Sequence, residues 1–346
     1  MDQDNFIRGT GALQSEHDPR TVKHENLVAM AAPLPISGGK VYVAGDIDDQ
    51  HRVGICTAIS FTQNRQKANG RKYSPDFQYL LQKKFFDGNW TEGSSIFNAL
   101  KVGKTYGLLP AELFKDLTGK PYVTEADRYR SYDSYIALLR SIPLEEILRL
   151  LNLCTDKIAG YASVDVTDPQ AVARAINDSQ AGILCRYGCQ KNWWTSITGQ
   201  SSWQPKDIDP LRYGPETSGH AIGMIAWNYA NDFINMLANT WGTMWDLLGL
   251  AHINWSNYKM NEAWTILLTA PVIPKFVFTK TLRAGDKGLD VKMLQTTLNK
   301  ALGLHLIVDG NFGINTLKAV QQFQTVHFLV SDGVVGPKTN TALNLI

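Results

Sequence analysis

The spacing of apolar residues divides the chain into a helical first part and a second part rich in strands. The pattern turns helical just after Gly54, and Pro75 follows a serine at the position that helices favour for proline. Further helices are predicted over residues 94–100, 144–153 and 169–178. Short runs typical of strands follow over residues 182–185, 221–227, 233–238 and 251–255.

Helices that come first and strands that come later indicate an α+β fold with two lobes and a groove between them. We assign this domain to residues 41–270. Residues 1–40 are polar and show no period, so we expect an extended arm, with the hypothesis that it lies across the groove and inhibits. Residues 271–280 contain Pro271 and Pro274 and are predicted to be a linker.

A short repeat marks a second, smaller domain over residues 281–346. The segment Asp309–Thr316 recurs 23 residues later as Asp332–Thr339, and each copy begins with an Asp-Gly pair that favours a tight turn. We predict that Thr316 and its counterpart Thr339 cap the helices that follow. The expected product is a small all-α domain of three helices.

Charge and hydropathy restrict the possible partners. With 34 basic and 32 acidic residues the formal net charge is +2, too close to balance to favour a nucleic acid partner. No stretch is apolar for long enough to predict a membrane span, and the most apolar one, 263–273, contains Pro271. The N-terminus lacks the pattern of a signal peptide, so we expect any export to use another route.

The cysteines do not predict a disulfide scaffold or a metal site. Four cysteines in 346 residues are too few for such a scaffold. Cys185 and Cys189 form a CxxxC pair, but no second pair completes a ligand set, and we interpret both as ordinary thiols. The chain has no HxxxH or CxxC motif, so neither a metal nor a cofactor is predicted.

Cys56 is the candidate nucleophile, because it stands between Val53-Gly54-Ile55 and a helix-like run. A thiol at a helix N-terminus lies at the positive end of the helix dipole, which favours the thiolate. Gln50, six residues earlier, is close enough in sequence to fold back beside the sulfur. Its amide and the Cys56 backbone N–H would together hold an oxyanion.

A cysteine nucleophile needs a base, and His220 is the best placed of the seven histidines. Asn239 follows 19 residues later across a predicted hairpin, where its side chain can orient the imidazole while Trp241 shields the hydrogen bond. His51 is a rival base, but it lacks such an asparagine and tryptophan. In the alternative interpretation, the cysteine and the histidine are ordinary core residues.

The order of these residues resembles that of the papain family of cysteine peptidases over residues 40–260. The resemblance is carried by Gln50-(x5)-Cys56, by Gly219-His220-Ala221, and by Asn239-Thr240-Trp241-Gly242 followed by Trp245. It implies a two-lobed papain-like fold in which the catalytic residues are Cys56, His220, Asn239 and Gln50. It also implies substrate binding by Gly219 and Trp241.

A further segment, Glu92-Gly93-Ser94-Ser95, is similar to the family's glycine turn, which implies that Gly93 and Ser94 pair with the substrate backbone. Three positions depart from the family pattern, one of them mildly, since Thr240 stands where the family usually has serine. The usual framework cysteine is missing before Cys56, as in the bacterial and viral branch of the family. Trp245-Asp246 replaces a Trp-Gly pair, which affects local packing rather than the Cys-His pair.

The C-terminal segment is similar to the peptidoglycan-binding domain found on many wall hydrolases. The agreement begins at Leu282-Arg283-Ala284-Gly285 and continues through both Asp-Gly repeats. The resemblance implies binding to bacterial peptidoglycan, with Asp309, Phe312 and Thr316 as candidate contacts. Similar domains also serve as protein-interaction or prodomain modules.

The two resemblances together predict a cysteine endopeptidase held at the bacterial cell wall, acting as a monomer. The first hypothesis is a lysin that cleaves peptide bonds of peptidoglycan, of the phage endolysin type, which reaches the wall by holin-type release or on virions. The alternative is a protease that acts on protein substrates and is only anchored to the wall. A third hypothesis is a non-catalytic wall-binding protein with a decayed peptidase domain.

Overall fold

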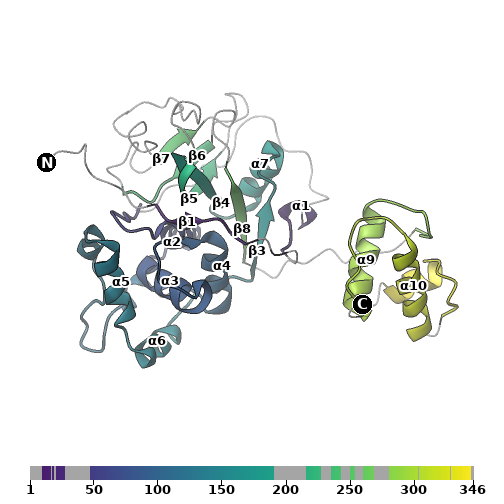
Figure 1. The fold of residues 1–346 in the computed structure, drawn as a ribbon, viewed down its shortest axis with the longest axis horizontal. Helices are drawn as coiled ribbons and strands as arrows, with labels where there is room; N and C mark the ends of the chain where they lie inside the picture. Colours follow the sequence, from purple (N-terminus) through teal and green to yellow (C-terminus); the bar gives the residue numbers. More distant parts are fainter. Residues whose placement is uncertain are drawn as a thin grey trace. The chain divides into compact units, whose positions relative to one another are not determined.

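The structure, a computed structural model, describes residues 10–16, 18, 21–27, 47–190, 216–226, 235–242, 250–253, 260–268, 280–302, 304–327 and 329–343. The chain divides into two compact units, Met1–Pro271 and Val272–Ile346 (Figure 1). The boundary falls within the predicted linker, residues 271–280, of which Lys280 alone is described. Across the described ranges, every helix is too short or too polar to cross a membrane.

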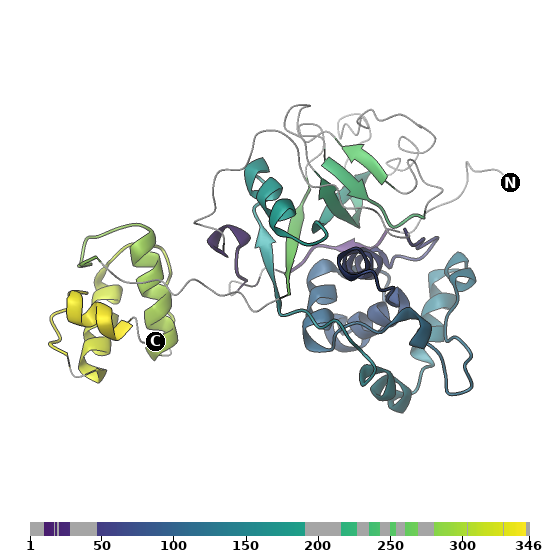
Figure 2. The same cartoon turned by 180° about the vertical axis from the view of Figure 1, so that it is seen from behind.

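The first unit contains a helical lobe built on α2, Cys56–Asn69, and α3, Pro75–Gln82 (Figures 1 and 2). Gly70 ends α2 in the left-handed conformation that favours glycine after a helix. Ser74 begins α3, because its hydroxyl accepts a backbone N–H from the first turn. Pro75 takes the first helical position, as predicted.

The rest of the lobe follows from α3 along the chain. Its elements are a π-helical segment Lys83–Asp87, β2 Ser94–Ser95, α4 Ile96–Thr105, α5 Tyr132–Arg140 and α6 Leu144–Leu151. The helices predicted near α4 and α6 are confirmed. The sequence pattern did not predict α5, although Ser131 supplies a capping hydroxyl to its first turn.

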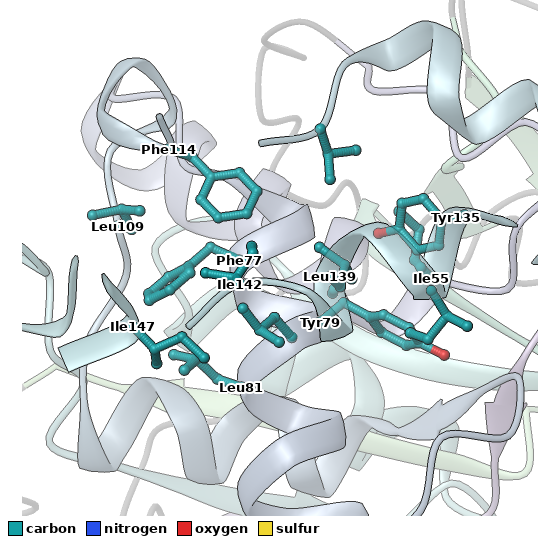
Figure 3. Packing of buried hydrophobic residues seen from close by; sticks show 14 of the residues in the cluster. Ile55, Phe77, Tyr79, Leu81, Leu109, Phe114, Tyr135, Leu139, Ile142 and Ile147 are labelled. Carbon is teal, nitrogen blue, oxygen red and sulfur yellow. The ribbon is translucent and has the colours of Figure 1, made fainter. Parts of the chain in front are cut away.

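One apolar cluster holds these helices together (Figure 3). Phe77 and Leu81 from α3 lie in it with Leu139 from α5 and Ile147 from α6. Each such buried side chain stabilises the fold by about 1.5–3 kcal/mol relative to an exposed one. Tyr79 of α3 is also fully buried in this cluster. The core therefore holds α3 in place where residues 93–95 contact it.

The second lobe is an antiparallel sheet of strands in the order β3-β8-β4-β5-β6-β7. The strands are β3 Gly160–Val164, β4 Ile183–Gln190, β5 Glu216–Ala226, β6 Asn235–Ala238, β7 Leu250–Ile253 and β8 Glu262–Leu267. The helix α7, Pro169–Asp178, packs on this sheet at β3, β5 and β8. The predicted strands correspond to β4, β5, β6 and β7, whereas β3 and β8 were not predicted.

The two lobes meet where α2 packs against β5 (Figures 1 and 2). The described part of residues 1–40 includes β1, Ala12–Leu13, and α1, His24–Leu27. β1 pairs in parallel with β2 of the helical lobe and also contacts β5 of the sheet. This short strand therefore lies against both lobes at the N-terminal end of α2.

Over its described residues the second unit contains three helices, as predicted: α9 Leu289–Leu302, α10 Ile314–Val326 and α11 Pro337–Leu343. Its core includes Val291, Leu298 and Phe323, all fully buried. The helices are short, so packing of their apolar sides rather than helix propensity stabilises the domain.

The repeat in the sequence becomes a repeated hydrogen-bond network. In the first copy the Gln295 Nε2 lies 2.8 Å from Asp309 Oδ1 and 3.1 Å from Thr316 Oγ1, and Gln295 Oε1 accepts the Gly310 amide at 2.9 Å. In the second copy Gln324 has the same contacts at 2.8, 3.1 and 2.8 Å, and its partners are Asp332, Thr339 and Gly333. A buried glutamine thus holds each Asp-Gly turn against its helix.

The prediction that Thr316 caps a helix is wrong. α10 begins at Ile314 after an N-cap, Gly313, that has no side-chain hydrogen bond. Thr316 lies inside the helix, where its hydroxyl contacts Gln295 and the Asn311 carbonyl. Thr339 likewise lies inside α11. The repeat spacing reflects the glutamine network rather than capping.

Candidate active site

Cys56 begins α2, as the sequence predicts, and lies fully buried where the two lobes meet. Burial raises the pKa of its thiol to about 11. Backbone amides of Ala221, Gly11, Thr57 and Cys56 itself partly offset this rise by donating toward the sulfur. The predicted thiolate is therefore not the favoured form in this structure, because loss of water outweighs the helix end.

His220 lies in the middle of β5, and Asn239 follows the end of the neighbouring strand β6. The His220 Nε2 lies 2.7 Å from Asn239 Oδ1. Since an amide oxygen only accepts, Nε2 carries the proton and Nδ1 carries the lone pair of a base. Burial lowers the pKa of His220 to about 4, against a smaller opposing effect of Asn239, so the imidazole is neutral near pH 7.

The sulfur and the imidazole come from opposite lobes. The amide of Ala221, the residue after His220, donates toward the Cys56 sulfur, and both residues belong to one apolar cluster. Packing of α2 against β5 therefore brings together two residues that are 164 positions apart in the sequence. Both side chains are neutral in this buried setting.

Gln50 is completely buried beside this pair. The Thr240 hydroxyl donates to Gln50 Oε1 at 2.5 Å, and Gln50 Nε2 donates to the Val53 carbonyl at 3.2 Å. This orientation turns the amide nitrogen toward the loop that leads into Cys56. Thr240 also donates its backbone amide to Asn239 Oδ1 at 2.8 Å, so it links the predicted oxyanion donor to the predicted orienting residue.

Trp241 packs flat against the His220 ring, with centroids 4.6 Å apart and planes at 25°. Its side chain is fully buried, and it closes one side of the hydrogen bond between His220 and Asn239. Gly242 follows with φ of 72°, a backbone conformation that favours glycine. Trp245, which belongs to the same sequence motif, lies outside the described residues.

Three of the predicted substrate-binding residues, Gly93, Ser94 and Gly219, contact the N-terminal arm. The Ser94 amide donates to the Gly11 carbonyl at 2.8 Å, and the Gly11 amide donates to the Gly219 carbonyl at 3.1 Å. Arg186 Nε donates to the Ala12 carbonyl at 2.8 Å. The arm backbone therefore fills the space between Gly93-Ser94 and Gly219, directly over Cys56.

The narrow space between the arm and the Gly93-Ser94 segment explains why position 93 is a glycine. Gly93 has φ of 91°, and a Cβ built on it would lie 2.5 Å from the Gly11 carbonyl oxygen. Any other residue at Gly93 would therefore exclude a peptide backbone from this position. The structure thus brings together Cys56, His220, Asn239, Gln50, Gly93, Ser94, Gly219 and Trp241 at one place.

Solved structures with known activity share this fold. Xylellain, a cysteine protease from Xylella fastidiosa, has a TM-score of 0.55 and 16% identity, covering 76% of this chain and 97% of that chain. A digestive procathepsin proteinase from Tenebrio molitor larval midgut has a TM-score of 0.52 and 15% identity, covering 75% and 78%. The first unit has the papain-like fold. The two-lobed α+β prediction is confirmed.

The second unit matches a family model over residues 287–343, described as "Putative peptidoglycan binding domain". Zinc D-Ala-D-Ala carboxypeptidase from Streptomyces albus G is 38% identical over 66 residues, 18% of this chain and 26% of that protein. An uncharacterized protein from Kitasatospora aureofaciens is 49% identical over 59 residues, 17% of this chain and 50% of that protein. The chain therefore spans a quarter to a half of these curated relatives.

The rival base of the papain-like unit, His51, faces two carboxylates. Its Nε2 lies 3.1 Å from Glu125, its Nδ1 lies 3.4 Å from Asp49, and its ring stacks on Tyr129 with centroids 3.7 Å apart. Burial lowers the pKa of His51, and the two carboxylates oppose this effect. His51 thus supports the loop around Gln50, whereas His220 immediately precedes Ala221, whose amide is directed toward the sulfur.

Sequence reasoning missed two contributors to the papain-like site. Thr240 links Gln50 to Asn239. Its place in the sequence between Asn239 and Trp241 is the signal that could have indicated this role. Arg186 lies in β4 opposite Ala221, and nothing in its sequence neighbourhood indicates that it reaches the cleft. Among the residues that the structure describes, no group of three His, Cys, Asp or Glu side chains could hold a metal ion.

In the peptidoglycan-binding domain, the three candidate contacts have different surroundings. Asp309 and Thr316 line a groove of about 630 Å³ whose other lining residues include Ile307, Ile314 and Lys318. Both also belong to the Gln295 network. Phe312 is 2% exposed and lies in the apolar core.

Proposed function

We propose that this protein is a cysteine peptidase that acts at the bacterial cell wall and cleaves peptide bonds of peptidoglycan. The observation that carries the proposal is the meeting of Cys56 with the His220–Asn239 pair across two lobes of a papain-like unit. The same chain carries a segment that matches a peptidoglycan-binding domain. The combination supports wall peptides as the substrate class.

The geometry supports a two-step hydrolysis. The Cys56 sulfur attacks the carbonyl carbon of an amide while His220 Nδ1 takes the thiol proton. The Cys56 amide and Gln50 Nε2 stabilise the oxyanion that forms. The carbon–nitrogen bond then breaks, and the leaving amine takes the proton from His220. Water, deprotonated by His220, attacks the thioester and releases the acid and the free thiol.

We also propose that the arm keeps this site closed. Residues 10–13 occupy the cleft and contribute to the burial of Cys56, which is completely inaccessible. The Gly11 amide of the arm is directed toward the sulfur. The arm must therefore leave before a wall peptide can bind.

The groove beside Asp309 is the proposed contact for peptidoglycan. It combines exposed apolar side chains, Ile307 at 82% and Ile314 at 63%, with polar groups such as Asp309 and Lys318. Such a mixture suits the amide groups and methyl groups of wall peptides and N-acetyl sugars. Binding there would raise the local concentration of substrate for the papain-like unit.

Digestion of purified peptidoglycan tests the proposed activity. The full chain should release soluble fragments with new amino groups and no new reducing sugars, and Cys56→Ser should abolish release. Casein cleavage without wall release would favour a protease that is only anchored to the wall. Absence of both activities, with no labelling of Cys56 by an epoxide inhibitor after arm displacement, would favour a non-catalytic wall-binding protein.

Sedimentation with insoluble walls tests the groove. Ile307→Ser should lower the bound fraction about tenfold, because it removes a large apolar contact from the groove. Val330→Ser is the matched control: Val330 occupies the equivalent position of the second repeat and is 79% exposed, but it does not line the groove. Equal binding by the two variants would contradict this location.

A further inference from the structure

A buried ion pair lies beneath the cleft, outside the proposed catalytic group. Lys83 Nζ is 2.8 Å from Asp87 Oδ2, and the two side chains are 0% and 5% exposed. Both residues belong to the π-helical segment that follows α3. Burying two charges costs desolvation energy, so such a pair is weak evidence for stability and invites a functional explanation.

The ion pair holds the inner side of the Gly93–Ser94 strand, which borders the cleft. Lys83 Nζ donates to the Gly93 carbonyl at 2.8 Å, and the Ser94 hydroxyl donates to Asp87 Oδ1 at 2.9 Å. Asn98 of α4 donates to the same oxygen at 2.7 Å. Hydrogen bonds to charged groups inside a protein are stronger than neutral ones, so these contacts restrain Gly93 and Ser94 firmly.

Two neutral side chains of α3 add to this support. The Tyr79 hydroxyl accepts the Gly93 amide at 3.0 Å. Gln82 Nε2 lies 3.2 Å from the Ser94 hydroxyl and 3.3 Å from the Ser95 carbonyl. The groups of residues 93–95 that face the lobe are therefore all held from one side.

The opposite side of the same strand faces the cleft. The Ser94 amide donates to the Gly11 carbonyl of the arm at 2.8 Å. Gly93, with φ of 91°, has the backbone freedom of glycine, and without support it would sample other conformations. The position of the Ser94 amide therefore depends on the contacts beneath it.

We propose that Lys83 and Asp87 are positioning residues that fix the Gly93–Ser94 strand so that the Ser94 amide meets the backbone carbonyl of any peptide in the cleft. In this structure that peptide is the arm. The extension to substrates rests on the proposed peptidase function. Neither residue touches the cleft occupant; both act through the strand.

Amide hydrogen exchange on the full chain tests the proposal without requiring any catalysis. The double variant Lys83→Met/Asp87→Asn removes both charges, so no uncompensated ion remains buried. Exchange in fragments that span residues 93–96 and residues 10–13 should become about tenfold faster, because the charged hydrogen bond to Gly93 is lost. This outcome is independent of whether the protein cleaves peptides.

A less deeply buried ion pair of the same unit serves as the control. Arg65 and Asp156 form two hydrogen bonds of 2.7 and 2.9 Å, and their side chains are 4% and 15% exposed. Arg65→Met/Asp156→Asn also removes both charges, and asparagine tolerates the φ of 49° at position 156. It should leave exchange at residues 93–96 and 10–13 unchanged. Equal acceleration in both double variants, or none in either, would overturn the proposal.

Two further measurements separate positioning from general stability. Ser94→Ala removes the hydroxyl contacts with Asp87 and Gln82 but leaves both charges in place, so it should speed exchange of residues 93–96 even if the double variant does not fold. No change in Ser94→Ala would then count against the proposal. With an active enzyme, Lys83→Met/Asp87→Asn should raise KM about tenfold and change kcat less than twofold, since the strand binds the peptide and performs no chemistry.

Discussion

The Cys56 sulfur is subject to two opposing influences. Its place at the start of α2 and the amides directed toward it favour the thiolate, while burial favours the neutral thiol. Burial prevails, and the pKa rises to about 11. His220 is also neutral, because burial lowers its pKa to about 4. In the proposed mechanism, the nucleophile and the base are therefore both in place but latent while the arm covers the cleft.

A pH profile of thiol alkylation checks this latency. Because the thiolate is the reactive form and the pKa of Cys56 is raised, the rate in the full chain should be low at pH 7 and rise with pH toward about 11. Iodoacetamide labelling followed by mass spectrometry measures the rate at this residue, and Cys56→Ser identifies the labelled site. A plateau that begins below pH 8 would contradict the expected protonation state.

Among the elements, the repeated loop and helix of the C-terminal domain show how a short sequence pattern becomes structure. Gln295 and Gln324 are 2% and 1% exposed, and each satisfies an Asp-Gly turn and the following helix. The repeated Asp, Gly and Thr are visible in the sequence. The glutamines that join them lie in the preceding helices, α9 and α10, outside the repeated segment.

Replacing either glutamine should destabilise this domain by a similar amount. Gln295→Ala and Gln324→Ala each leave a turn amide without its acceptor and remove one of the two partners of a threonine hydroxyl, at a cost of about 2 kcal/mol. Exchange of the Gly310 and Gly333 amides in the full chain would report the loss. Gln322→Ala, on the exposed face of α10, is the control and should have little effect. A large difference between Gln295→Ala and Gln324→Ala would show that the two networks are not equivalent.

For the whole molecule, the proposed regulation and the proposed targeting belong to different segments of the chain. The arm lies in the cleft of the papain-like unit, and the peptidoglycan-binding domain carries its own groove. Displacement of the arm is therefore expected to switch on the peptidase without affecting attachment to the wall. These two properties can be varied independently.

Gly11→Val tests the closing role of the arm. A Cβ on Gly11 would lie 2.5 Å from the Gly54 carbonyl oxygen, so valine cannot fit and the arm should leave the cleft. Water would then reach Cys56, and alkylation at pH 7 should become at least about tenfold faster, together with peptidase activity. Leu13→Ser is the control, because Leu13 is 48% exposed and its loss leaves the arm in place. An unchanged rate in Gly11→Val would mean that the arm does not control access.

The sequence predicts most elements whose signals are local and misses those that depend on distant partners. Ser74 and Pro75 identify the start of α3, because capping acts within one turn. β3 and β8 pair with each other although their paired residues lie about a hundred positions apart in the sequence, and β8 also pairs with β4. Neither strand has turn signals or alternation strong enough to identify it alone. The same limit explains the wrong assignment of Thr316, whose partner Gln295 lies 21 residues earlier.

The sequence by itself determined the likeness to papain-like peptidases and the two-domain plan, because residue type and order carry them: Cys56, His220 and Asn239 in one unit, and the Asp-Gly repeat in the other. Only the tertiary structure decided that burial favours the neutral thiol of Cys56 and that the arm lies in the cleft. It also decided that Lys83 and Asp87 contact the Gly93–Ser94 strand from the side away from the arm. These properties depend on burial and on contacts between segments far apart in the chain, which no short stretch of sequence encodes.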